Sequence, residues 1–199
     1  DWKGSVQARK SAVGDGEGGR MFVIIGEMDL WAENERVSWR GATPDGVAFA
    51  KAEYGTPPAR DIAFGAGHFV VVGPEGLIET SHDGFNWTRE RSDPDEDFRS
   101  ITWTGLHFLA QGKDTWTSLD GAVWERIPRP VPCTIAWARE TWSFMGIGLS
   151  WGGNIFHAKD LITWEKLRVP DGPSLNAVAR GERPVAGKPR RSFPTASPP

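Results

Sequence analysis

Residues 80–90 read TSHDGFNWTRE and place a polar turn of Ser, Asp and Gly shortly before a tryptophan. Asp and Ser side chains hydrogen-bond to nearby backbone groups and Gly accepts a positive φ, so this pattern predicts a tight turn between two strands. The same pattern returns at 117–127 as TSLDGAVWERI, and in weaker form at 42–52 as ATPDGVAFAKA and at 157–167 as HAKDLITWEKL. A turn that recurs in this way indicates a repeated architecture.

The aromatic residue that closes each turn recurs at intervals of about 40 residues, a period typical of propellers and solenoids. These positions are Trp2, Phe49, Trp87, Trp124 and Trp164. Apolar strands lie between them, such as DIAFG from Asp61, FVVVG from Phe69 and SITWTG from Ser100. Each repeat therefore predicts four short antiparallel strands a to d, with the Ser/Thr-x-Asp-Gly turn between c and d. We predict an all-β fold, a β-propeller of four-stranded antiparallel blades.

The number of blades depends on how the two ends of the chain meet. We predict a single domain over 1–199 with blades at about 11–52, 60–91, 98–128 and 133–168. A fifth blade would combine 174–199 with 1–7, since closure of the ring by the N-terminal strand removes exposed sheet edges. The alternatives are a fragment of a six- to eight-bladed propeller, or four blades followed by a tail. Prolines and basic residues favour disorder for 188–199.

Composition excludes several classes of partner and site. The net charge of −3 gives no field that would attract nucleic acid, and no apolar run is long enough to span a membrane. Cys133 is the only cysteine, so a disulfide within the chain and a metal site built from paired cysteines are excluded. The four histidines lack metal-ligand spacing. We predict no cofactor and no metal, a monomer, and a secreted or extracytoplasmic location.

The repeated turn resembles the Asp-box, or BNR repeat, of sialidases, sortilin-type receptors and related β-propellers. Two copies carry the resemblance in full: Ser81, Asp83, Gly84 and Trp87, and Ser118, Asp120, Gly121 and Trp124. Two weaker copies keep Asp45 with Gly46, and Asp160 with Trp164, where Leu161 replaces glycine. In that family the box is a structural turn remote from the substrate, so the resemblance implies a fold and not a ligand.

Alternating strand direction sorts the connections onto two ends of the ring. The a-to-b turns and the Asp-box turns share one end, called here the turn end, and the b-to-c and d-to-a connections share the other, called the loop end. Long loops on a rigid scaffold commonly bind ligands. The candidate ligand-binding residues at the loop end are Trp31, Trp39, Arg60, Asp61, Arg99 and Trp151. Aromatic rings can stack on the apolar face of a sugar, and arginine guanidinium groups can hydrogen-bond to its oxygens. Alternatively, the tryptophans pack the insertion 27–39, EMDLWAENERVSW, onto the ring.

Three functions compete on this basis. The first is a non-catalytic binding module that presents loops to a carbohydrate or protein ligand. The second is a sialidase-like glycoside hydrolase, for which Tyr54 and Glu53 are the nearest catalytic candidates. Such an enzyme needs a carboxylic acid, a nucleophile and an arginine cluster, and only Arg60 and Arg99 are available for that cluster. The third is a structural or assembly role, including that of a fragment of a larger propeller.

Overall fold

The computed structural model describes residues 4–16, 19–30, 35–127, 134–138, 141–148 and 154–167, which form four antiparallel sheets of four consecutive strands each. Blade 1 consists of β1 (Gly4–Gly16), β2 (Gly19–Leu30), β3 (Glu35–Thr43) and β4 (Lys51–Tyr54). Blade 2 consists of β5 (Asp61–Gly65), β6 (His68–Val72), β7 (Ile78–Ser81) and β8 (Thr88–Arg91). Blade 3 consists of β9 (Ser100–Trp103), β10 (Phe108–Gln111), β11 (Thr115–Ser118) and β12 (Glu125–Ile127). Blade 4 consists of β13 (Thr134–Ala138), β14 (Ser143–Gly148), β15 (Asn154–Ala158) and β16 (Glu165–Leu167).

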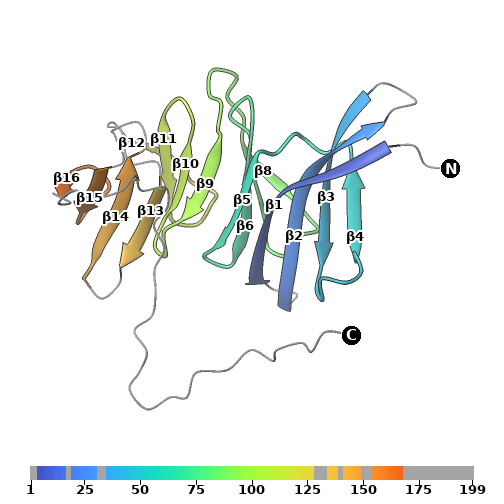
Figure 1. The fold of residues 1–199 in the computed structure, drawn as a ribbon, viewed down its shortest axis with the longest axis horizontal. Coiled ribbons are helices and arrows are strands. Elements are labelled where there is room, and N and C mark those ends of the chain that lie inside the picture. Colours follow the sequence, from blue (N-terminus) through green and yellow to red (C-terminus); the bar gives the residue numbers. More distant parts are fainter. Residues whose placement is uncertain are drawn as a thin grey trace, which may run out of the picture.

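The four blades stand side by side in chain order, from blade 1 to blade 4 (Figure 1). The first strands of blades 1, 2 and 3 lie next to one another, because β1 contacts β5 and β5 contacts β9. This arrangement confirms the predicted all-β fold of four-stranded antiparallel blades. The blade count stays a prediction, because 174–199 lie outside the described residues.

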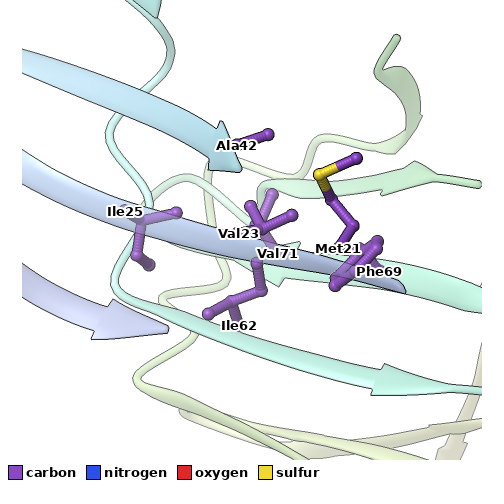
Figure 2. Close-up of a cluster of buried hydrophobic side chains, with 7 residues drawn as sticks. All are labelled: Met21, Val23, Ile25, Ala42, Ile62, Phe69 and Val71. Atoms are coloured by element: carbon purple, nitrogen blue, oxygen red, sulfur yellow. The ribbon is translucent and has the colours of Figure 1, made fainter. Parts of the chain in front are cut away.

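Hydrophobic clusters between blades hold the array together. Blades 1 and 2 share a cluster to which blade 1 contributes Met21, Val23, Ile25 and Ala42 and blade 2 contributes Ile62, Phe69 and Val71 (Figure 2). Trp87 packs against this cluster, Trp124 against the one between blades 2 and 3, and Trp164 against the one between blades 3 and 4. The recurrent tryptophan therefore fills the space between neighbouring sheets.

The turn between β7 and β8 explains why Ser, Asp and Gly recur before that tryptophan. The Ser81 hydroxyl donates to Asp83 Oδ1 at 3.0 Å and accepts the backbone N–H of Gly84 at 2.8 Å. Asp83 Oδ1 also accepts the backbone N–H groups of Phe85 and Asn86, both at 2.8 Å. The two side chains thus satisfy three backbone donors that no strand partner could reach.

The same bonds recur in the other blades. Asp120 accepts the N–H groups of Ala122 and Val123 at 2.9 and 3.0 Å, and Asp45 accepts those of Val47 and Ala48 at 2.8 and 3.2 Å. In blade 4, Asp160 accepts the N–H groups of Ile162 and Thr163 at 2.8 and 2.5 Å, although Leu161 replaces the glycine. Three tryptophans donate their indole N–H to a carbonyl of the same turn: Trp87 to Gly84, Trp124 to Gly121 and Trp164 to Leu161.

Gly84 and Gly46 occupy equivalent turns but different surroundings, which makes them a matched pair for mutagenesis. Both have a positive φ, +78° and +74°, yet a Cβ on Gly84 would lie 2.6 Å from Val23 Cγ2 whereas one on Gly46 would meet nothing within 4 Å. Gly46→Ala should cost about 1–2 kcal/mol from backbone strain alone. Gly84→Ala should cost about 1–3 kcal/mol more, because the methyl group overpacks the interface. Equal unfolding midpoints in urea would contradict this close approach of the turn to blade 1.

Asp83 predicts a loss of stability in acid. Burial acts to raise the pKa of Asp83, but the hydrogen bonds from Asn86, Phe85 and Ser81 outweigh it and hold this pKa at about 2. Because the folded value lies below the ordinary one, the stabilisation is complete above about pH 4 and disappears as the pH falls towards 2. Urea unfolding between pH 5 and 2 should show a decline that is shallower in Asp83→Asn. Parallel curves for both proteins would contradict this role of the carboxylate.

Residues 27–30 and 35–39 of the insertion 27–39, which the sequence places in a loop-end connection, lie in strands instead. Its two arms continue β2 and β3, which pair in register from Phe22 opposite Thr43 to Leu30 opposite Glu35. Charged side chains pair across the strands: Arg36 with Asp29 at 2.7 Å, and Arg9 with Glu27 at 2.6 Å. Alternating side chains and opposite charges thus favour an extended hairpin over an irregular loop.

Residues 4–7, assigned to the fifth blade by the closure prediction, lie instead in β1. Gly4 is opposite Leu30 and Gln7 is opposite Glu27, so this segment pairs with the extended arm of β2. The physical reason is local: β1 and β2 are adjacent in the sequence, and closing a short loop costs less entropy than joining the two ends of the chain.

Candidate functional site

The site that the structure builds lies at the turn end, between blades 3 and 4. A cavity of about 480 Å³ opens between β11 and β12 on one side and the turn 159–162 on the other. Its lining combines the apolar residues Ile127, Trp137, Phe144 and Leu161 with the charged residues Glu125, Arg126, Lys159 and Asp160. This volume lies within the range of small-ligand and side-chain pockets.

Leu161 gives a physical reason why this interface differs from the others. At the equivalent position between blades 2 and 3, a Cβ on Gly121 would already lie 3.0 Å from Val70 Cγ2, so glycine permits close packing. Leu161 carries a whole side chain at that place and packs it into the cluster with Ile135 and Trp137. The sequence shows the glycine-to-leucine change, but its consequence requires the tertiary structure.

A second cavity of about 210 Å³ adjoins the first and shares His107, Thr117 and Glu125 with it. Its remaining lining residues come from the turn of blade 3: Ser118, Leu119, Asp120 and Val123. The three shared residues make the two cavities neighbours, and together they are called here the blade 3/4 groove.

His107 and Thr117, which line this groove, each have a buried polar atom. Among the described residues, neither His107 Nδ1 nor Thr117 Oγ1 has a hydrogen-bond partner, and both atoms are buried. In blade 2 the equivalent Thr80 donates to Glu90 at 2.6 Å, but blade 3 has Ile127 in the place of Glu90. Burial lowers the pKa of His107, which favours the neutral imidazole at pH 7. Each buried polar atom without a hydrogen-bond partner lowers the free energy of unfolding by roughly 1–3 kcal/mol. A core optimised for stability alone would avoid such atoms.

Exposed apolar side chains surround the groove at the turn end. Leu106, Leu119, Val123 and Ile162 line the groove itself, and Trp142 lies beside its lining residue Trp137. Trp142 is 70% exposed and has φ = +50°, a conformation that bulky residues rarely adopt. Its ring lies 6.1 Å from that of Trp137, edge to face, and Trp137 lines the groove. An exposed aromatic held in strained backbone geometry is typical of binding sites.

At the loop end the structure brings three of the predicted ligand-binding residues near one another. Arg60 Nη1 donates to Asp97 Oδ1 at 2.7 Å, and the guanidinium groups of Arg60 and Arg99 together help to lower the pKa of Asp97. Asp61 accepts the backbone N–H groups of Ile62 and Ile101, both at 3.0 Å, so it connects blade 2 to blade 3. Asp61 therefore has a structural contact, while Arg99 is exposed.

The remaining predicted residues lie apart from this loop-end group. Trp39 is 6% exposed and packs edge-on against Phe49 at 6.0 Å, so its ring offers no free face to a ligand. Trp31 and Trp151 lie outside the described residues. Tyr54 is opposite Trp39 and 60% exposed, whereas Glu53 is opposite Arg40, on the other face of the same sheet. The two catalytic candidates therefore point away from each other.

Within the described ranges, no group of three or more His, Cys, Asp or Glu residues could hold a metal ion. In the same part of the chain, no helix is long and apolar enough to cross a membrane. Sequence reasoning missed His107, Thr117 and Trp142 as site residues, because it placed function at the loop end.

The fold and the groove define a class: an all-β array of four-stranded blades with a pocket between two of them. No protein-family model and no curated protein matches the chain. Similar solved structures include "YCF48 bound to D1 peptide", at TM-score 0.41 and 23% identity, covering 55% of this chain and 39% of that one.

Two further similar structures are HIRA(644-1017) and the AfRom2 CNH domain. HIRA gives TM-score 0.46 at 11% identity, with coverage of 82% of this chain and 52% of that chain. AfRom2 gives 0.49 at 12%, with coverage of 80% and 55%. This chain thus spans 39% to 55% of the length of these three structures. Their TM-scores support no conclusion about a ligand of this chain.

Proposed function

We propose that this protein is a non-catalytic binding module that holds a segment of another protein in the blade 3/4 groove. The observation that carries this proposal is the position of a ligand-sized apolar cavity beneath a rim of exposed apolar side chains. Apolar side chains are normally scattered on a surface, and their concentration around a cavity is typical of interaction sites.

The chemistry of the groove favours a peptide over a compact polar ligand. Ile127, Trp137, Phe144 and Leu161 supply apolar surface, which suits a bulky side chain. The groove continues along blade 3 into the second cavity, so an extended segment can occupy both with successive side chains. Trp142 stands at the rim as an aromatic anchor of the kind that dominates binding energy at interfaces.

Trp142→Ala should lower the affinity for such a partner by about 30-fold, because loss of an interface hot spot costs about 2 kcal/mol or more. Partners would first be selected from a peptide display library on the intact chain, and affinities would then be measured by calorimetry. Since Trp142 is exposed, the unfolding midpoint should change little.

Val47→Ala is the matched control for this test. Val47 is also exposed, at 88%, but it lies in the turn between β3 and β4 of blade 1, far along the array from the groove. Its replacement should leave affinity unchanged. If Trp142→Ala and Val47→Ala behave alike, or if no peptide in the library binds, the proposed function is wrong.

We also propose that the four Ser/Thr-x-Asp-Gly turns, including the degenerate turn at Asp160, are Asp-boxes and relate this chain to the Asp-box propellers. The recurrence of the same Asp-to-backbone bonds in all four blades supports this relationship. A glycan remains an alternative ligand within this proposal, with the loop-end arginines Arg60 and Arg99 as its contact points. A glycan array on the same protein separates the two ligand classes.

A further inference from the structure

We propose that the segment Lys188–Phe193 of this same chain docks in the blade 3/4 groove, so that the protein carries an internal competitor for its own ligand. This inference rests on the proposed function, because it concerns the same groove. The segment lies outside the described residues and reads KPRRSF, three basic residues and a phenylalanine.

The charge of the smaller cavity complements the basic residues of this segment. Its lining contains two carboxylates, Asp120 and Glu125, and no lysine or arginine. Asp120 Oδ1 binds the turn backbone, and the carboxylate retains its negative charge while doing so. An arginine fork pairs well with carboxylates placed in this way.

The larger cavity complements the phenylalanine. It presents the rings of Trp137 and Phe144 together with Leu161, an environment in which an aromatic ring gains both buried area and favourable ring contacts. Residues two apart in an extended segment point to the same side, about 6.6 Å from each other. Arg191 and Phe193 have this spacing, and Pro194 favours an extended conformation for the residue before it. One extended segment can therefore fill both cavities.

The chain between the groove and the segment is long enough. The groove is bounded by the turn 159–162, and β16 follows that turn directly and ends at Leu167. Roughly two dozen residues then lead to Arg191, and a flexible linker of that length spans on average about 27 Å. A tethered segment of this kind has an effective concentration in the millimolar range at a nearby site.

The test uses a fluorescent peptide of residues 187–194, GKPRRSFP, titrated into the full-length protein and into the full-length double variant Arg191→Glu, Phe193→Ser. The variant should bind the peptide about tenfold more tightly than the wild type, because its own tail no longer competes. The peptide GKPEESFP should not bind. Glu125→Gln, made in the tail variant, should weaken binding several-fold, whereas Asp95→Asn at the loop end should not.

Equal affinity of wild type and tail variant for GKPRRSFP would overturn the internal competitor, and so would absence of binding to the tail variant. Neither result touches the proposed function, which is tested separately by library partners and Trp142→Ala. A dimer that depends on concentration and disappears in the tail variant would place the segment in the groove of a second copy, and would overturn the intramolecular form.

Discussion

Replacing Glu79 with leucine should lower the free energy of unfolding by about 3–5 kcal/mol, the usual cost of leaving a buried partner charge alone. Glu79 Oε2 lies 2.6 Å from Arg40 Nη1 across the interface between blades 1 and 2, and the two side chains are only 8% and 4% exposed. The Arg40 guanidinium also lies over the Trp87 ring at 4.8 Å. Without Glu79, the buried guanidinium would lose its 2.6 Å partner, and its contact to the Pro57 carbonyl at 3.3 Å is weak.

The double variant Arg40→Met, Glu79→Leu should recover most of that loss, since two apolar side chains of similar volume need no desolvation of charge. Urea unfolding of the wild type, both single variants and the double variant measures the coupling directly. Arg20→Leu is the surface control, because its pair with Asp15 at 3.4 Å is exposed and should contribute less than about 0.5 kcal/mol. Additive losses for Arg40 and Glu79 would show that the pair does not act as a unit.

Trp124→Ala should cost about 3–5 kcal/mol, because it opens a cavity in the cluster between blades 2 and 3. Trp124 packs against that cluster, beside Phe108 at a ring distance of 6.5 Å, and donates its indole N–H to the Gly121 carbonyl at 2.6 Å. Chemical unfolding followed by circular dichroism would measure the loss. An unfolding midpoint unaltered by the substitution would show that Trp124 does not support the interface.

Trp142→Ala removes the same side chain from an exposed site and is the matched control for Trp124→Ala. It should cost less than about 1 kcal/mol. The contrast between the two variants separates a tryptophan that packs between blades, Trp124, from an exposed tryptophan for which we propose contact with a partner, Trp142.

Each blade interface uses different chemistry around the common tryptophan. Blades 1 and 2 share the Arg40–Glu79 ion pair, and between blades 2 and 3 the Arg91 guanidinium lies 3.9 Å from the Trp116 ring. Blades 3 and 4 instead enclose the groove. Interfaces that are stabilised by different contacts favour one order of neighbouring blades over another.

The sequence alone determined the blade, because the information that specifies it is local. Ser81, Asp83 and Gly84 are within hydrogen-bonding reach of their own turn whatever the rest of the chain does, and the confirmed bonds at Asp45, Asp120 and Asp160 follow from the same short spacing. Strand order and antiparallel pairing follow from short connections, and the position of Trp87 between sheets follows from its size.

Only the tertiary structure decided where a ligand could bind. The exposure of Trp142, the burial of Trp39 and the loss of a partner for Thr117 depend on which residues from distant repeats meet across an interface. The effect of Leu161 on packing depends on the distance between two blades and not on any local pattern. The period of a sequence predicts the contacts inside one repeat. A groove between two repeats forms where the side chains at their interface differ from those at the other interfaces, and this depends on the tertiary structure.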